Sequence, residues 1–341
     1  MTFLDQSHRQ APTGLSKLLH LDWALLLLVG AVAATGLRMN YSVADGTFTP
    51  WAGAHMIRFG IGLAIMLVVA VIHIRFWRAV TPFVYVAALV LMVLVEFFGS
   101  VGMGAQRWID LGFMRLQPSE VMKIALVMVL ALYYDWLSPE RVSHPLWLIP
   151  PLLLIAIPTV LVLKQPDLGT SVLLLAGGAV VMFAAGVSWW YYTAAVAFVV
   201  GGINLILQSK GTAWQVLKDY QYRRIDTFLN PESDPLGAGY HITQSKIALG
   251  SGGISGRGFM EGTQSRLNFL PEKHTDFIFT TLAEEFGFVG SAGLLVLYAL
   301  IVIFCATSAM RNRDRFSALL IFGIGATVFF FFAANMAMVM G

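Results

Sequence analysis

The chain has 341 residues, of which 57% are apolar and only 12% are charged, and its mean hydropathy is +0.74. This charged fraction is about half that of a typical soluble domain, and a water-soluble fold of this size could not bury so much apolar surface. The composition excludes a soluble enzyme, a disordered chain and a disulfide scaffold, and it predicts a polytopic membrane protein. The net charge of +3 is too small to indicate a nucleic-acid partner, and the single cysteine, Cys305, permits no intrachain disulfide.

The apolar runs predict an all-α transmembrane helical bundle. A spanning helix needs roughly 20 apolar residues, somewhat fewer where charged side chains at its ends reach the interface. Tryptophans lie at or near several run ends, as interfacial anchors do. The nine predicted spans are 23–37, 54–74, 81–98, 118–136, 146–163, 168–186, 189–207, 277–308 and 316–340.

Basic residues in the short loops predict the orientation of these spans. With the N-terminus inside, the inner loops carry eight Lys and Arg residues and the short outer loops four. This predicts a cytoplasmic N-terminus, with segment 208–276 as a large extracytoplasmic loop between spans seven and eight. The first run resembles a signal peptide, but the spans that follow favour an uncleaved anchor. The apolar end at Met340-Gly341 suggests that the single membrane domain, 1–341, is truncated at its C-terminus.

Two polar segments, 99–117 and 208–276, are long for an otherwise economical membrane protein, which is typical of functional loops. Residues 212–229 are amphipathic, and they would form a helix that meets anionic lipid headgroups or one that lies on the rest of the protein. Six glycines between 250 and 262 would let backbone N–H groups approach a phosphate, or they would simply make the loop flexible.

Asp276 lies at the predicted start of the eighth span. A helix N-terminus stabilises negative charge, so an ionised carboxylate is expected there, near the outer interface. Such a carboxylate could accept a proton from a substrate or merely cap the helix. The local sequence alone favours the cap.

Further ionisable residues near the outer ends of spans suggest one outward-facing polar cavity. Glu120 and Lys123 are three residues apart on one helical face and can pair. The cavity would also hold Gln165, the cations Arg107, Lys164 and Lys246, and the carboxylates Asp167 and Asp276. This mixture suits an anionic headgroup, a proton acceptor and a divalent cation. The alternative is a set of structural ion pairs that fix helix register.

Long motifs resemble the SEDS family (shape, elongation, division and sporulation), and within it the RodA branch. They are GAQRWIDLG at 104–112, QPSEVMK at 117–123, QPDLGTS at 165–171, YRRIDTFLNPESDPLGAGYHITQSKIALGSGGISGRG at 222–258, GTQSRLNFLPEKHTDFIF at 262–279 and LAEEFG at 282–287.

The resemblance implies a peptidoglycan glycosyltransferase of the bacterial cytoplasmic (inner) membrane, active on its extracytoplasmic face. Such proteins polymerise lipid II, an undecaprenyl-diphosphate-linked disaccharide pentapeptide, together with a class B penicillin-binding protein transpeptidase. Surrounding membrane lipids are the other expected partners. Family members usually have ten spans, one more than the nine predicted here.

The resemblance also reverses the preference at Asp276, which becomes the expected catalytic carboxylate, as a general base or linked to a divalent cation (Mg²⁺ or Mn²⁺). The expected substrate-binding residues are Arg107, Glu120, Lys123, Gln165, Asp167, Gln244, Lys246, Gln264, Glu272 and His274. Two alternatives stay open, a lipid II transporter (flippase) and a non-catalytic scaffold of the elongation machinery. A transporter would need polar residues through to the inner leaflet, whereas the candidates gather on the outer side.

Overall fold

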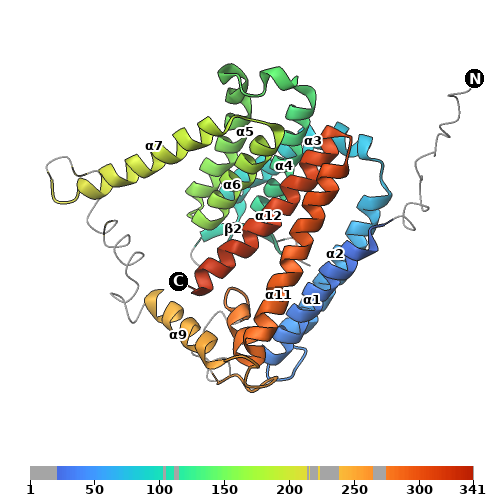
Figure 1. The fold of residues 1–341 in the computed structure, drawn as a ribbon, viewed down its shortest axis with the longest axis vertical. Helices are drawn as coiled ribbons and strands as arrows, with labels where there is room; N and C mark the ends of the chain where they lie inside the picture. Colours follow the sequence, from blue (N-terminus) through green and yellow to red (C-terminus); the bar gives the residue numbers. More distant parts are fainter. Residues whose placement is uncertain are drawn as a thin grey trace, which may run out of the picture.

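The computed structural model describes residues 21–102, 105–110, 115–212, 215, 222, 238–263 and 274–340. The predicted all-α membrane bundle is confirmed (Figure 1). Among the described residues, eight helices are long and apolar enough to cross a membrane: α1 (Trp23–Val43), α2 (Trp51–Val71), α3 (Ile74–Phe98), α5 (Pro145–Lys164), α6 (Leu168–Ala185), α7 (Trp189–Gln208), α11 (Ile278–Arg311) and α12 (Arg315–Met340).

The remaining predicted span, 118–136, is helix α4 (Pro118–Trp136), and it is not among the eight. It carries three charged side chains, Glu120, Lys123 and Asp135. It packs against α3, α6 and α12, and eleven of its residues are buried. Charged side chains that would be unstable in lipid are stabilised by contacts with neighbouring helices. This explains why α4 crosses the centre of the bundle without a strongly apolar sequence.

Several helices extend beyond the apolar runs that predicted them. Helix α1 continues to Val43 instead of ending at 37, and α3 begins at Ile74 instead of 81. The added turns contain polar side chains that have partners: Ser42 hydrogen-bonds Glu285 of α11, and Arg78 forms an ion pair with Asp314 at 2.5 Å. A count of apolar residues stops at the first charged residue, whereas the helix continues wherever protein satisfies that charge.

The polar segment after α3 folds into a small antiparallel sheet with strand order β1-β2-β3. The strands are β1 (Ser100–Gly102), β2 (Ala105–Asp110) and β3 (Arg115–Leu116). The sheet connects α3 to α4, and β2 contacts both of these helices. It therefore holds Arg107, on β2, against the bundle.

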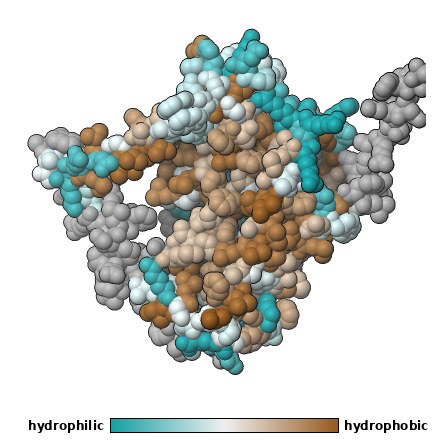
Figure 2. Space-filling view, viewed as in Figure 1, coloured by the Kyte–Doolittle hydropathy of each residue, from teal (hydrophilic) through white to brown (hydrophobic). Residues whose placement is uncertain are grey.

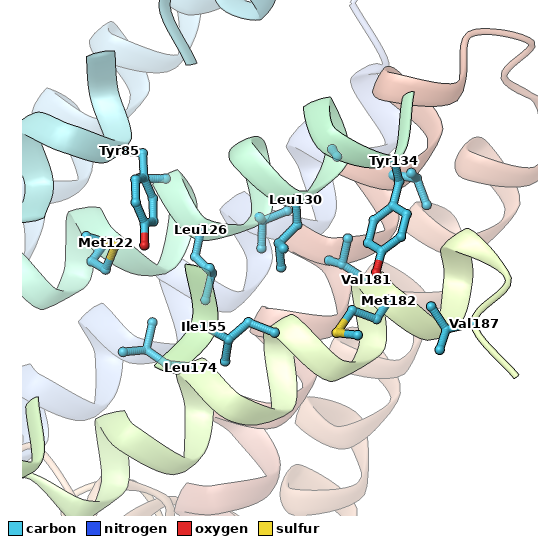
Figure 3. Close-up of a cluster of buried hydrophobic side chains, with 14 of the residues drawn as sticks. Tyr85, Met122, Leu126, Leu130, Tyr134, Ile155, Leu174, Val181, Met182 and Val187 are labelled. Carbon is cyan, nitrogen blue, oxygen red and sulfur yellow. The ribbon is translucent and has the colours of Figure 1, made fainter. Parts of the chain in front are cut away.

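The hydrophobic core lies where α3, α4, α5, α6 and α12 meet (Figure 3). Met122, Leu126 and Leu130 of α4 point toward Ile155, Leu174 and Val181 of the neighbouring helices. The hydroxyl of Tyr85 donates to the carbonyl of Leu154 at 2.8 Å, which satisfies a polar group inside this core.

Glycines allow the core helices to approach closely. A Cβ on Gly178 of α6 would lie 2.6 Å from the Ile155 side chain of α5. A Cβ on Gly323 of α12 would lie 2.5 Å from Val127 of α4 and 2.7 Å from Val181 of α6. Small residues at helix crossings are how membrane helices gain packing contacts, so α12 is locked between α4 and α6.

Helix α7 runs away from the bundle (Figure 1). All of its residues are described, and none is buried. Within segment 208–276 the structure describes helix α9 (Ala238–Ser251) and the glycine-rich turns that follow it, residues 252–263. The predicted amphipathic helix over 212–229 lies outside the described residues, apart from Thr212, Gln215 and Tyr222.

On the face shown in Figure 2, hydrophobic side chains cover the middle of the molecule, and hydrophilic ones gather mainly toward its top and bottom. This banding is the surface that a bilayer requires. The chain is therefore a multi-pass membrane protein.

Candidate functional site

A cavity of about 780 Å³ lies between the α1–α2 pair on one side and helices α4 and α12 on the other. Helix α11, with the residues just before it, forms its third side. Four of the predicted site residues line it together: Glu120, Lys123, His274 and Asp276. The structure therefore brings the motif before α11 and the start of α4 to one place.

Asp276 lies in the turn that precedes α11, and its side chain is exposed. The N-cap residue of α11 is Phe277, not Asp276. Two residues earlier, the ring of His274 stacks on Trp51 of α2, with centroids 4.7 Å apart and planes 19° from parallel. This stacking joins the Asp276 turn to the start of α2.

Glu120 and Lys123 form the predicted ion pair in the first turns of α4. The Lys123 Nζ lies 2.8 Å from Glu120 Oε2, and its side chain is 6% exposed, against 49% for Glu120. The same ammonium lies 4.5 Å from the ring centroid of Phe331 on α12. A buried lysine needs such partners, so the pair is held firmly while Glu120 still faces the cavity.

Most of the cavity wall is apolar and comes from α1, α11 and α12. Polar residues that were not predicted from the sequence also line the cavity, including His55 of α2. His55 Nε2 lies 3.1 Å from the carbonyl oxygen of Ala33 on α1. The sequence contained a signal for His55, because a histidine inside an apolar run is an ionisable group at membrane depth, and such groups indicate functional sites.

Three other predicted site residues form a separate cluster on the α5–α6 turn. The Arg107 Nε donates to the Gln165 carbonyl at 2.9 Å, and Arg107 Nη1 lies 3.7 Å from Asp167 Oδ2. Asp167 is the N-cap of α6 and accepts from the Thr170 N–H at 3.0 Å. The Gln165 amide donates to the Met92 carbonyl of α3 at 3.2 Å. These residues tie β2 and α3 to the α5–α6 turn, and they do not belong to the cavity lining.

Gln244 and Lys246 lie on α9, also outside the cavity lining. Ser245 between them is buried, with its hydroxyl 2.9 Å from Thr280 Oγ1 and 2.8 Å from the Val339 carbonyl oxygen. Helix α9 is thereby fastened to both α11 and α12. Gln264 and Glu272 lie outside the described residues.

The glycine-rich turns after α9 pack against the backbone of α11, which gives some of their glycines a structural role. A Cβ on Gly252 would lie 2.0 Å from the Ala283 carbonyl oxygen, and one on Gly256 would lie 2.1 Å from that of Glu285. The N–H of Gly258 donates to the same Glu285 carbonyl at 3.1 Å. At these positions glycine is needed for backbone contact between two segments.

The carboxylates of the cavity suit a cation shared with a substrate better than one enclosed by protein. No group of three or more His, Cys, Asp or Glu side chains that could hold a metal ion occurs in the described ranges. Mg²⁺ is usually bound by one or two carboxylates together with substrate phosphates. The exposed carboxylate of Asp276 fits that arrangement.

The arrangement combines an exposed carboxylate, an ion pair and an apolar enclosure between helices. The carboxylate can take a proton from an oriented hydroxyl group. The apolar walls can hold a hydrocarbon chain whose polar end lies beside the ion pair. An amphiphilic substrate with a hydroxyl or phosphate group at its head therefore fits the cavity.

Known proteins match nearly the whole chain. MrdB of Escherichia coli K12, a peptidoglycan glycosyltransferase, is 41% identical over 324 residues, which are 94% of this chain and 85% of MrdB. FtsW of Trichlorobacter lovleyi, a probable peptidoglycan glycosyltransferase, is 34% identical over 343 residues, which are 95% of this chain and 85% of that protein. The higher identity to MrdB agrees with the predicted RodA branch.

Solved structures share the fold. One chain of a peptidoglycan synthase complex, solved to show how polymerization and crosslinking are coordinated, superposes with a TM-score of 0.78 at 29% identity, covering 95% of this chain and 88% of that one. The rod shape determining protein RodA of Thermus thermophilus superposes with a TM-score of 0.68 at 26% identity, covering 95% and 86%. The family model of FtsW, RodA and SpoVE, described as a cell cycle protein, matches residues 16–341. From motifs, fold and sequence identity alike, this chain belongs to the FtsW/RodA/SpoVE family.

Proposed function

We propose that this protein is a peptidoglycan glycosyltransferase that polymerises lipid II into glycan strands for cell elongation. Relatives with this activity in their names match 94% and 95% of the chain. The observation that supports a location for the active site is that Asp276 and the Glu120–Lys123 ion pair line the same cavity. A polymerase of a lipid-linked sugar needs these parts: a proton acceptor, a charged region for a diphosphate and an apolar space for the lipid.

In this reaction Asp276 accepts the proton of an acceptor sugar hydroxyl. The resulting oxygen nucleophile attacks C1 of the donor sugar, forming the new glycosidic bond as the bond from C1 to the lipid diphosphate breaks. The electron pair of that bond leaves with the diphosphate. The exposure of Asp276 to the cavity supports this role, because a base must reach the hydroxyl that it deprotonates.

The leaving diphosphate gains negative charge in the transition state, and stabilising that charge lowers the barrier. Lys123 lines the same cavity as Asp276, which supports a role for its ammonium in stabilising that charge. In the alternative role, Asp276 would instead hold a divalent cation together with the substrate's own phosphates, and that cation would supply this stabilisation. The lipid would lie along the apolar walls of α1, α11 and α12.

A class B penicillin-binding protein is the proposed partner. The solved synthase complex to which this chain is similar coordinates polymerization with crosslinking. We also propose that the N-terminus is cytoplasmic and that the cavity lies toward the extracytoplasmic side, because the short loops that the topology places inside are richer in Lys and Arg.

A glycan ladder assay tests the proposal. The chain is reconstituted in liposomes with a class B penicillin-binding protein and supplied with fluorescent lipid II, and the products are separated on a gel. We expect a ladder of glycan strands from the wild-type chain and none from Asp276→Asn. Movement of lipid II between leaflets without a ladder would instead indicate a transporter. Neither a ladder nor movement of lipid II from a folded chain would indicate a scaffold, and a ladder indifferent to Asp276 would contradict the role of Asp276.

A further inference from the structure

Helix α11 is two helical pieces joined at a break. Gly287 has φ 62° and ψ −158°, a backbone conformation that essentially only glycine adopts. The first piece, 278–286, follows directly on the turn that carries Asp276. How this short piece is held therefore decides where Asp276 lies.

Backbone groups of the glycine-rich turns replace the helical hydrogen bonds lost at the break. The N–H groups of Phe288 and Val289 donate to the carbonyls of Gly253 and Ile254 at 2.9 and 3.1 Å. In the opposite direction, the Arg257 N–H donates to the Glu284 carbonyl at 3.0 Å. The break is thus a docking point for the turns after α9.

Two adjacent glutamates at the end of the first piece are almost fully buried. Glu284 is 0% exposed, and its Oε1 accepts from the N–H and the hydroxyl of Thr263 at 2.7 and 3.0 Å. Glu285 is 2% exposed, and its Oε1 accepts from the hydroxyl of Ser42 on α1. Glu284 therefore binds the glycine-rich turns, and Glu285 binds α1.

Arg38, one turn before Ser42 on α1, contacts the same region. Its guanidinium lies 4.6 Å from the ring centroids of both Phe259, in the glycine-rich turns, and Phe286, in the first piece of α11. Because α1 also lines the cavity, this contact and the Ser42–Glu285 hydrogen bond fix the first piece of α11 relative to the cavity wall that α1 forms.

We infer that Glu284 and Glu285 are positioning residues for glycosyl transfer, which they serve by anchoring the Asp276 segment to Thr263 and Ser42. Neither glutamate lines the cavity, so neither is placed to touch the substrate. Burying carboxyl groups is costly, and apolar side chains would give ordinary helix packing at lower cost. The hydrogen bonds to Thr263 and Ser42 supply the fixed geometry that packing alone does not specify. This inference rests on the proposed function for its kinetic consequences only.

The test compares two pairs of variants. Glu285→Ala is compared with Glu285→Gln, which keeps an acceptor oxygen and the side-chain volume. Ser42→Ala is compared with Ser42→Thr, which keeps the hydroxyl donor. The maximal rate and KM for fluorescent lipid II are measured for each chain. We expect Glu285→Ala and Ser42→Ala to lower the maximal rate by about 10- to 100-fold with little change in KM, because a small misplacement of a reacting group has effects of this size. Glu285→Gln and Ser42→Thr should retain most of the rate, and the alanine double variant should lose no more than either single one.

Amide hydrogen exchange of 278–286 is measured in the same proteins, and it needs no catalysis. Faster exchange there in both alanine variants is expected, with unchanged exchange in the α4 core. Glu261→Ala, at an exposed position in the same turns, is the matched control and should behave as wild type. Unchanged exchange in 278–286, or alanine variants as active as wild type, would overturn the inference. A wild-type chain with no polymerase activity would count against the proposed function alone, and the exchange result would still decide on the anchor.

Discussion

Gly256 lies so close to α11 that a side chain there must displace backbone. Its φ is +81°, and an added Cβ would lie 2.1 Å from the Glu285 carbonyl oxygen. Gly253, three residues earlier, has φ +55° but open space around an added Cβ. An alanine at either position would be strained by the positive φ, but only an alanine at Gly256 would also clash with α11. Comparing the two substitutions therefore separates the cost of the strain from the cost of the clash.

Gly256→Ala is expected to destabilise the protein by at least about 2 kcal/mol more than Gly253→Ala, since both introduce left-handed strain but only the first overpacks the contact with α11. Thermal unfolding of the purified proteins in detergent measures the difference. Equal shifts of the unfolding temperature would mean that the turns do not pack on α11 as described.

Asp167 is expected to act in structure rather than in substrate binding. It caps α6 through Thr170 and faces Arg107. Asp167→Ala should lower stability by about 1 kcal/mol, as for the loss of an N-cap, and leave the affinity for lipid II unchanged. Binding of fluorescent lipid II together with thermal unfolding checks both points. Weaker binding without loss of stability would return Asp167 to the substrate site.

At the scale of elements, the start of α12 is fixed by charge. Asp314 accepts from the N–H and hydroxyl of Ser317 at 3.0 and 2.5 Å and from Arg78 of α3 at 2.5 Å. Burial alone would raise the pKa of Asp314, but the hydrogen bonds from Ser317 and Arg78, together with the charge of Arg78, hold that pKa below its ordinary value. The ionised carboxylate therefore stabilises the junction between α11 and α12.

This lowered pKa predicts how stability depends on pH. The contribution of Asp314 is complete above the ordinary aspartate pKa, about 4, and it is lost as the pH falls through the lower pKa of the folded state. Asp314→Asn should therefore lower the unfolding temperature at pH 7 and have progressively less effect below pH 4. Asp110→Asn, at an exposed position in β2, serves as the control. A constant difference between Asp314→Asn and wild type from pH 3 to pH 7 would contradict the assignment.

The helices were predictable from apolar runs, but their ends and one break were not. The run at 81–98 gave α3 without its first two turns, because Arg78 ended the apolar pattern while Asp314, remote in sequence, satisfies its charge. The break at Gly287 is invisible to hydropathy because its replacement hydrogen bonds come from the turns after α9. Local pattern predicts where a helix is, and tertiary partners decide where it stops or breaks.

At the scale of the whole molecule, the cavity lies where the α1–α2 pair, α4, α11 and α12 come together. The sequence correctly grouped Glu120, Lys123 and Asp276 through topology and motif. It could not separate Arg107 from them, since that depends on β2 packing against the α5–α6 turn. It also missed His55, whose place in the wall follows from how α2 lies beside α1.

The apolar walls predict that bulk in the cavity blocks the lipid. Val32 of α1 lines the cavity, so Val32→Trp should weaken lipid II binding by about 10-fold, the scale that a small change of fit in an apolar pocket produces. Ile61 of α2 is exposed and lies outside the lining, and Ile61→Trp should bind as wild type. Equal affinities in the two variants, measured with fluorescent lipid II, would place the lipid elsewhere.

The central claim is that Asp276 in this cavity is the proton acceptor of glycan polymerisation. The most direct test compares Asp276→Asn with wild type in the same liposomes. It measures the dissociation constant of lipid II and the rate at which lipid II is polymerised. Asparagine keeps the shape of the side chain but cannot accept the proton. We predict a dissociation constant within a few-fold of wild type and a rate lower by about 10²- to 10⁴-fold, the usual contribution of a general base. A rate close to that of wild type with equal binding would contradict the claim.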